Sequence, residues 1–421
     1  MDLTRAAAEA LDATDPLAGF RERFSGADDE SENRLLYLDG NSLGRMPRET
    51  PAAVARVVEQ EWATGLVGSW SSWIGEATRL GDELAAGVLG ARPGEVLVGD
   101  TTTVNLYKLI VAGAAARPDR DVLVCSADDF PTDRYVVAGV AEARGMTVRE
   151  VPADLDEGLD LGALAAALDD RVAVVVLSHV AYRSGALADL PAITRLVHDA
   201  GALVLWDLSH SVGSVPAGLA DAGADLAVGC TYKYLNGGPG APAFLYVRKD
   251  LQTTLRSPIQ GWFGQRDQFE MGPAYDPAPG VERFGAGTPP VLGMAALAVG
   301  ARLIAEARVD RLAAKGRALT EQIIALGDAW LAPHGVVLAS PRDARRRGSH
   351  VTFAHPQAWQ LTQALVDRGV VPDFRTPDRV RLGPAPLYTR FVDVWDAMER
   401  FRDVLAEGAH EAYPVERARV T

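Results

Sequence analysis

Short apolar runs alternate with helical patterns through the middle of this chain, and this alternation limits the possible folds more than any other feature. The runs occupy residues 121–126, 172–180, 202–208, 225–230 and 243–247. Three of them are almost unbroken in Val, Leu and Ala, which is typical of strands covered on both faces. Helical patterns lie between them, for example at 133–144 and 190–200. The sequence therefore predicts an α/β fold built on a mostly parallel sheet.

The pattern changes twice toward the C-terminus. Residues 231–242 separate the last two runs, and their Gly- and Pro-rich part, 235–242, leaves no room for a helix. A parallel crossover needs a dozen or more residues, so the run at 243–247 is predicted to be antiparallel. After Pro290 a long helix is expected at 291–314, with helices near 318–331 and 359–367 and strands near 349–353 and 379–382. This part predicts a smaller α+β lobe beside the sheet.

Composition excludes several classes of protein. The chain carries 42 Lys and Arg against 56 Asp and Glu, a formal charge of −14, which argues against nucleic-acid and anionic-membrane partners. Two cysteines and seven scattered histidines give neither a disulfide framework nor the spacing of a metal site. No apolar run approaches the roughly 18 residues of a membrane span, and the N-terminus lacks a secretory signal pattern. We therefore expect a cytoplasmic enzyme without a metal.

Polar residues cluster directly after the predicted strands, where ligands bind in open α/β sheets. Lys233, between Tyr232 and Tyr234, follows a buried strand, so desolvation should favour its neutral, nucleophilic amine; the alternative is a lysine that extends to solvent. Asp207 lies 26 residues earlier, at another strand end. A lysine for a Schiff base and an aspartate for a pyridinium nitrogen are the groups that pyridoxal phosphate (PLP) requires. Further polar or aromatic candidates at strand and helix ends are Thr102, Thr103, Phe130, Asp133, Ser178 and His210.

Each of these candidates also has a simpler structural explanation. Thr102 and Thr103 at a helix N-terminus could bind a phosphate or could only cap the helix. Phe130 could cover a planar ring or belong to the core. The cluster 345–347 of three arginines is predicted to be a solvated turn.

One competing motif points to a different class of enzyme. Residues 40–44 read G-x-S-x-G, the nucleophile motif of serine hydrolases, but fewer than 40 residues precede it and Asp207 and His210 stand only three residues apart. A phosphate-binding loop of nucleotide hydrolases is absent from the sequence, and the Gly-rich segment at 238–240 precedes a strand and not a helix.

Nine segments, taken together, resemble the kynureninase family of fold type I PLP enzymes. They are YLDGNSLG (37–44), TTTVNLYK (101–108), DFPTDRY (129–135), WDLSHSVG (206–213), YKYLNGGPGAPAF (232–244), GWFG (261–264), GTPPVL (287–292), RGSHVTF (347–353) and RLGPAPLY (381–388). The resemblance implies a seven-stranded, mostly parallel sheet in a large PLP-binding domain at 51–290. It also implies a small domain at 291–421, joined by the N-terminal segment 1–50, and a homodimer with active sites at the subunit interface.

The resemblance also implies roles for individual residues. Lys233 forms the Schiff base, Asp207 pairs with the pyridine nitrogen, Phe130 stacks on the ring, and His210 lies near it. The phosphate is held by Thr102, Thr103 and Tyr232, with Trp262 and Thr288 from the second subunit, while Asp133 and Ser178 complete the cofactor pocket. Arg381 binds the substrate α-carboxylate, with Arg375 as an alternative, and Asn41, Ser42 and Trp70 are further substrate-binding residues.

The implied reaction is hydrolysis of L-kynurenine to anthranilate and L-alanine in tryptophan catabolism, with Lys233 moving the α-proton and Tyr232 as a proton donor. Two departures from the family pattern bear on the substrate. Small residues at Gly285 and Ala286 leave room for a ring-substituted kynurenine, and Trp70 stands where relatives that prefer 3-hydroxykynurenine have a histidine. The alternatives are another class V enzyme such as a cysteine desulfurase, which needs a loop cysteine that neither Cys125 nor Cys230 provides, and a non-catalytic PLP-binding protein.

Overall fold

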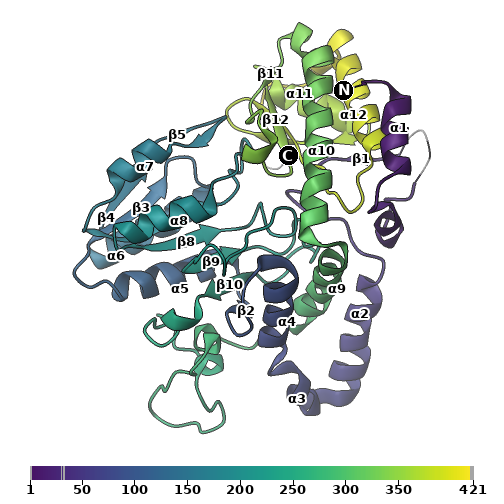
Figure 1. The fold of residues 1–421 in the computed structure, drawn as a ribbon. Helices are drawn as coiled ribbons and strands as arrows, with labels where there is room; N and C mark the ends of the chain where they lie inside the picture. The colour runs from purple at the N-terminus through teal and green to yellow at the C-terminus, as the bar shows by residue number, and fades with distance from the viewer. Residues whose placement is uncertain (1, 30, 32–33, 418–421) are drawn as a thin grey trace.

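A seven-stranded sheet forms the centre of the larger lobe in the computed structural model, which describes residues 2–29, 31 and 34–417 (Figure 1). Its strand order is β2-β10-β9-β8-β7-β3-β4. The strands are β2 (Val96–Val98), β3 (Val122–Ser126), β4 (Thr147–Val151), β7 (Val172–Ser178), β8 (Leu203–Asp207), β9 (Leu226–Gly229) and β10 (Phe244–Val247).

All five apolar runs are strands, and the predicted strand directions are confirmed. The pairs β4–β3, β3–β7, β7–β8 and β8–β9 are parallel, whereas β10 is antiparallel to both β9 and β2. The sequence did not indicate β2 and β4. The first is only three residues long, and the second, TVREV, lies at the sheet edge and is mostly not buried. The carboxyl ends of β7, β8 and β9 therefore lie side by side.

Helices cover both faces of this sheet. On one face α5 (Thr102–Ala115) and α6 (Pro131–Arg144) pack against Leu123, Val174 and Leu205. On the other face α7 (Leu161–Ala167) and α8 (Leu190–Asp199) pack against Val124, Val175 and Val204. Residues Val172–Val176 of β7 are completely buried. Burying each such side chain contributes about 1.5–3 kcal/mol. Because a polar residue at any of these positions would lose that contribution, the strand consists of an unbroken apolar run and could be predicted from the sequence.

A second core belongs to the smaller lobe. Its antiparallel sheet has the order β11-β12-β15-β14, formed by Val337–Leu338, Val351–Ala354, Arg379–Leu382 and Asp373–Arg375. Helices α10 (Val309–Leu326), α11 (Ala358–Asp367) and α12 (Phe391–Ala406) pack on it. Helix α1 (Arg5–Ala13) lies against α12, and β1 (Leu36–Tyr37) pairs with β13 (Val370–Val371). The N-terminal segment thus contributes Ala8, Leu36 and Leu38 to this core; the domain limits themselves stay a prediction.

The single helix expected at 291–314 is wrong. Helix α9 (Val291–Ala307) ends before Arg308, which has φ 69°, and α10 begins at Val309 and includes most of the separate helix expected at 318–331. The apolar spacing continues across the break: α9 contributes Leu297 and Ile304 to the larger core, and α10 contributes Leu312 to the same core before Leu319 and Ile323 enter the smaller one. The helix is therefore interrupted at the left-handed Arg308, within the part of the chain that packs in the larger core.

The remaining elements are short. They are α2 (Thr50–Arg56), α3 (Trp70–Trp73), α4 (Glu76–Leu84), the hairpin β5 (Ala153–Asp154) and β6 (Gly158–Leu159), and the 3-10 or π segments Ala18–Arg23, Val57–Gly65, Leu66–Ser69, Ala85–Leu89, Lys249–Leu251, Trp262–Gly264, Val281–Phe284, Gly327–Leu331, Ala332–His334, Ala344–Arg346 and Ala409–Ala412. None of the helices in the described part of the chain has both the length and the apolar character that a membrane span requires.

Candidate active site

Lys233 lies in the loop that follows β9, and its side chain is buried. Its Nζ is 3.0 Å from His210 Nε2 and 6.0 Å from the ring centroids of both Phe130 and Tyr232. Burial lowers the pKa of Lys233, and the neighbouring Cys230 and Asp207 oppose that shift. The surroundings therefore favour the neutral amine that the sequence predicted.

The backbone of this loop is held by close packing on glycines. A Cβ atom on Gly44 would lie 2.3 Å from the carbonyl oxygen of Lys233, and the Gly44 N–H donates to Tyr232 O at 2.9 Å. A Cβ on Gly300 of α9 would lie 1.9 Å from the carbonyl oxygen of Leu235. Residues 40–44 thus hold the lysine loop in place, which is why the motif needs its second glycine.

Three buried carboxyl groups lie at the strand ends beside the lysine. Asp207, the last residue of β8, accepts from Ser209 N at 2.9 Å and from Ser209 Oγ at 2.6 Å. Asp129 accepts from the N–H groups of Ser126 and Ser178 at 2.8 and 2.9 Å, and burial raises its pKa to about 6.

Asp133, in the first turn of α6, is the least satisfied of the three. Its Oδ2 is buried without a hydrogen-bond partner among the described residues. Burial, followed by the charges of Asp207 and Asp129, raises its pKa well above the ordinary value. An orphaned buried acceptor costs free energy, about 1–3 kcal/mol, so this position favours a ligand that brings an N–H group.

Two histidines form a neutral group on the other side of Lys233. Burial is the largest cause that lowers the pKa of His210 well below its ordinary value, and the neighbouring Lys233 and Arg381 act in the same direction. The ring of His350, from the smaller lobe, lies 5.9 Å from the His210 ring, and burial also lowers its pKa. His210 can therefore accept a hydrogen bond from the amine without competing for its charge.

The start of α5 offers an anion site. The helix begins at Thr102, and Thr101 caps it by accepting from Val104 N at 3.3 Å. The N–H groups of Thr102 and Thr103 consequently lie in the first turn, where helical N–H groups lack partners within the helix and the helix dipole favours an anion. Thr101, and neither of the two candidate threonines, is the cap.

Arg381 is rigidly held on β15. It is 1% exposed, and it donates to Asp373 Oδ1 at 3.0 Å, Asp373 Oδ2 at 2.5 Å, Tyr182 O at 2.5 Å and Ser42 Oγ at 2.9 Å. With the Asn41 amide oxygen turned toward the guanidinium, that oxygen accepts from Arg381 Nε at 2.7 Å. Arg375 shares the same carboxylate, with its NH2 2.7 Å from Asp373 Oδ2. Two guanidinium groups thus meet on one buried carboxylate.

The structure brings most of the predicted residues together, but not all. One group of predicted residues lies around Lys233 and consists of Tyr232, His210, Phe130, Asp207 and Asp133. Ser178 adjoins this group because its N–H donates to Asp129. Asn41 and Ser42 contact Arg381. Trp70 and Trp262 instead pack together, with ring centroids 5.9 Å apart. Thr288 lines a separate cavity of about 370 Å³ that also contacts Thr101. Within one described chain, therefore, Trp70, Trp262 and Thr288 are not neighbours of Lys233.

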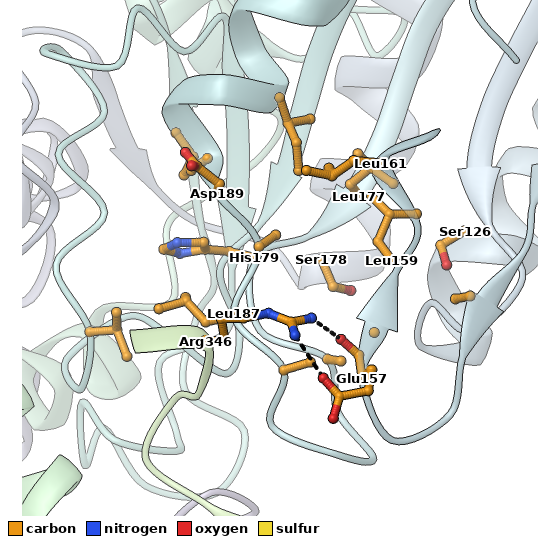
Figure 2. A pocket seen from close by; sticks show the side chains of 18 of the residues that line it. Ser126, Glu157, Leu159, Leu161, Leu177, Ser178, His179, Leu187, Asp189 and Arg346 are labelled. Atoms are coloured by element: carbon orange, nitrogen blue, oxygen red, sulfur yellow. Dashed lines mark hydrogen bonds and ion pairs between the residues drawn. The ribbon is translucent and has the colours of Figure 1, made fainter. Parts of the chain in front are cut away.

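The cavity shown in Figure 2, about 530 Å³, does not contain Lys233. It is lined by Ser178, His179 and Leu187, and also by Arg346, which donates to Glu157 Oε2 at 2.8 Å. Arg345 and Arg346 are exposed, as predicted for a solvated turn, but the prediction that Arg347 is solvated is wrong. Arg347 is buried and donates to Pro341 O at 2.6 Å and Arg342 O at 3.0 Å, because it holds the turn from inside.

Sequence reasoning did not single out Asp129, His350 or Asp373. Asp129 stands in the same strand-end segment as Phe130, and its position after β3 was a usable signal. His350 and Asp373 come from the smaller lobe, and only the packing of the two lobes brings them to the site. In the described part of the chain, no group of three or more His, Cys, Asp or Glu side chains could hold a metal ion.

Comparison with known proteins identifies relatives across the whole chain. The family model described as the kynureninase C-terminal domain matches residues 312–401. A kynureninase of Burkholderia pseudomallei strain 1106a is 44% identical over 419 residues, covering 97% of both chains. A kynureninase of Pseudomonas fluorescens is 43% identical over 404 residues, covering 94% of both chains.

Solved structures with low sequence identity share the fold. The cysteine desulfurase of Thermococcus onnurineus NA1 superposes with a TM-score of 0.75 at 19% identity, covering 89% of this chain and 94% of that one. A C-DES mutant with glycine covalently linked to its PLP cofactor gives a TM-score of 0.78 at 18% identity, covering 92% and 98%. These likenesses confirm the predicted fold type I architecture.

Proposed function

Because this chain belongs to the kynureninase family, we propose that it is a PLP-dependent hydrolase that cleaves the Cβ–Cγ bond of L-kynurenine, or of a ring-substituted analogue, to give anthranilate and L-alanine. The observation that carries this proposal is the buried Lys233, whose pKa burial lowers, beside Asp207 at the end of the neighbouring strand and Asp133 in the first turn of α6. We further propose that the enzyme acts in tryptophan catabolism in the cytoplasm.

The residues present fit PLP. The unpartnered Oδ2 of Asp133 and the carboxylate of Asp207 can accept the N–H of a protonated pyridine ring, and the first turn of α5 can bind a phosphate. When bound, PLP supplies an electron sink conjugated to the nitrogen of the substrate amino acid. Thr102, Thr103 and Tyr232 would hold the phosphate, Phe130 would cover the ring, and Ser178 and His210 would complete the pocket.

The chain's own residues then account for the proton transfers. Lys233 would hold PLP through its Nζ at rest, and its amine, when free of that link, would take the proton from the substrate Cα. Tyr232 is the proposed proton donor. Burial raises the pKa of its phenol, which is opposite to the shift toward neutrality that efficient donation would need, so Tyr232 keeps its proton at neutral pH. Asp207 and Asp133 would face the ring nitrogen and accept its N–H group.

The substrate carboxylate is proposed to bind Arg381, with Arg375 beside it. The Arg381 guanidinium has five N–H groups, and four of them donate to Asp373, Tyr182 and Ser42. The free N–H on NH1, and the more exposed Arg375, leave positive charge available for one carboxylate. Asn41 and Ser42 fix the position of the pair from the N-terminal segment.

A homodimer is proposed to complete the site with Trp262 and Thr288 of the second subunit. Two segments near Trp262 expose large apolar side chains, as a subunit interface would. Trp62, Leu66 and Val67 are 60%, 60% and 79% exposed, and Phe269 and Met271 are 63% and 75% exposed. Trp262, itself 38% exposed, contacts Phe269 with ring centroids 6.3 Å apart.

The ring preference is proposed from two positions. Gly285 does not open space by itself, because a Cβ there would lie 2.9 Å from the carbonyl oxygen of Phe263. Ala286 lines the 370 Å³ cavity together with Thr288, so in the proposed homodimer this loop would give a ring substituent room in the site of the second subunit. Trp70 belongs to an aromatic cluster with Trp73, Trp262 and Phe263, which offers apolar contact and favours rings without a 3-hydroxyl group.

The neighbouring functions lack support in the chain's own groups. Cys125 and Cys230 are buried, and burial raises the pKa of both thiols, that of Cys125 to about 12, so neither suits the persulfide role of a desulfurase. Ser42 donates to Asp373 at 2.8 Å and accepts from Arg381, an arrangement without the histidine that activates a hydrolase serine.

The test is reconstitution with PLP followed by a panel of kynurenines. The wild type should gain visible absorbance that Lys233→Ala abolishes, and product mass and anthranilate fluorescence should appear with L-kynurenine. A colourless reconstituted wild type would remove the cofactor assignment. If only 3-hydroxykynurenine is turned over, the proposed reaction class would still hold, but the proposed preference for rings without a 3-hydroxyl group would be refuted.

A further inference from the structure

Lys108 is a buried lysine outside the group around Lys233. It lies in the second turn of α5 and is 1% exposed. Its ammonium group donates to the Asp100 carboxylate and to the carbonyl oxygen of Phe284, the latter at 2.7 Å. These two acceptors come from segments far apart in the sequence.

The first acceptor belongs to the turn that precedes α5. Asp100 has φ 51°, a left-handed conformation that a non-glycine residue adopts only when its surroundings hold it there. Gly99 O accepts from Asn105 Nδ2 at 3.0 Å, and Ala243 N donates to Asp100 O at 3.0 Å. The turn is therefore fixed to α5 and to the start of β10, and it sets the direction of Thr102 and Thr103.

The second acceptor begins the loop that carries Thr288. Phe284 is buried and ends the 3-10 segment Val281–Phe284. The 370 Å³ cavity is lined by Gly99, Asp100 and Thr101 and by residues 285–290, which directly follow Phe284. The Lys108 ammonium therefore bonds one residue of the lining, Asp100, and the backbone of the residue that precedes the second lining segment.

An apolar side chain would fill this place without the cost of burying a charge. Burial lowers the pKa of Lys108, and only the Asp100 carboxylate opposes that shift. Breaking such a pair leaves a buried group unpaired. The contribution of Lys108 is therefore geometric: its two bonds fix the distance between the segment of Asp100 and the segment of Phe284.

We propose that Lys108 is a positioning residue that fixes the spacing between the turn at Gly99–Thr101, which directs the phosphate-binding threonines, and the loop that carries Thr288. This inference rests on the proposed function, because it takes the phosphate of PLP as the ligand of that turn. Lys108 acts through Asp100 and Phe284 and does not itself touch the ligand.

The experiment compares two cofactor forms that differ only at the phosphate. Cofactor-free Lys108→Met is titrated with PLP and with pyridoxal, which lacks the phosphate, and binding is followed by visible absorbance. We expect the affinity for PLP to fall about tenfold, the loss of one good hydrogen bond to a charged group, while the affinity for pyridoxal stays at the wild-type value. Lys108→Arg should restore part of the affinity for PLP.

A matched control separates positioning from stability. Lys315→Met removes another buried lysine, whose Nζ is 2.6 Å from Asp15 Oδ2 beside α10 and away from the cavity, and it should leave both affinities unchanged. If Lys108→Met does not fold, Asp100→Asn removes the same ion pair while Asn tolerates the left-handed φ. Equal weakening of PLP and pyridoxal, or no weakening of either, would overturn the positioning role. A wild type that binds neither would instead overturn the proposed function.

Discussion

Replacing Arg381 by lysine keeps the charge on β15 and removes the fork of N–H groups. The guanidinium reaches both oxygens of Asp373, at 3.0 and 2.5 Å, and also Tyr182 O and Ser42 Oγ. A lysine ammonium is a single point with three donors, so it cannot bond Asp373 bidentately and reach Tyr182 O at the same time. We expect Arg381→Lys to lose two charge-assisted hydrogen bonds.

The magnitude follows from burial. Both side chains of the pair are almost fully buried, 1% exposed for Arg381 and 2% for Asp373, so solvent does not screen the loss. Each charge-assisted bond contributes about 1.5–3 kcal/mol, and the free energy of unfolding should fall by about 3–6 kcal/mol. Arg375→Lys is the matched control. Its side chain is 26% exposed and shares Asp373 through one group, so we expect a loss of about 1 kcal/mol.

Urea unfolding of the cofactor-free proteins, followed by tryptophan fluorescence, measures these differences. Steady-state kinetics of the reconstituted proteins should show KM for kynurenine raised at least about tenfold in Arg381→Lys, with the affinity for PLP unchanged. A stability loss no larger for Arg381→Lys than for Arg375→Lys would refute the bonding argument. A larger rise of KM in Arg375→Lys would assign the carboxylate to Arg375.

Three further predictions concern stability. The pKa of Lys233 is lowered in the folded chain, so the unfolded chain binds the extra proton and folding stability rises with pH toward about 10.5. Lys233→Met should therefore stabilise the cofactor-free protein at pH 7 and flatten this rise of stability with pH. Urea midpoints that equal those of the wild type at every pH would contradict this prediction. Burial lowers the pKa of His179 to about 4, so about 3 kcal/mol of stability should be lost as pH falls from about 6.5 to 4. His179→Phe should reduce that acid slope, and an unaltered slope would exclude His179 as its source. Arg308→Gly relieves a backbone at φ 69° and ψ 126° and should stabilise by about 1 kcal/mol in urea unfolding, whereas destabilisation would show that the arginine is not strained.

The sheet was readable from the sequence where strands are buried on both faces. The runs that became β7 and β8 have no polar interruption before Ser178 and Asp207, so pattern and structure agree. The edge strand β4 has alternating polar residues and a weaker signal. The helix break at Arg308 leaves no mark on the local pattern, because the apolar positions continue through Val309 and Leu312 in the same core.

Some residues of the candidate site could likewise be predicted from the sequence, and others could not. Asp207, His210 and Lys233 follow buried strands, and the rule that ligands bind at carboxyl ends of parallel strands is enough to select them. Asp373 belongs to a short strand of the smaller lobe, and its importance comes from the two arginines that fold onto it. Such residues depend on how the lobes pack, which spacing along one chain does not encode.

The burial of both thiols has a practical consequence for measuring conformational changes of this protein. Cys125 and Cys230 are the only cysteines in the sequence, and both are buried with raised pKa values. At neutral pH a thiol in that state barely reacts with maleimide reagents. A cysteine introduced on the surface of α7 and another on α11 could therefore carry a pair of spectroscopic labels in an otherwise native background. Distances between such labels would report directly whether the two lobes approach each other when substrate binds.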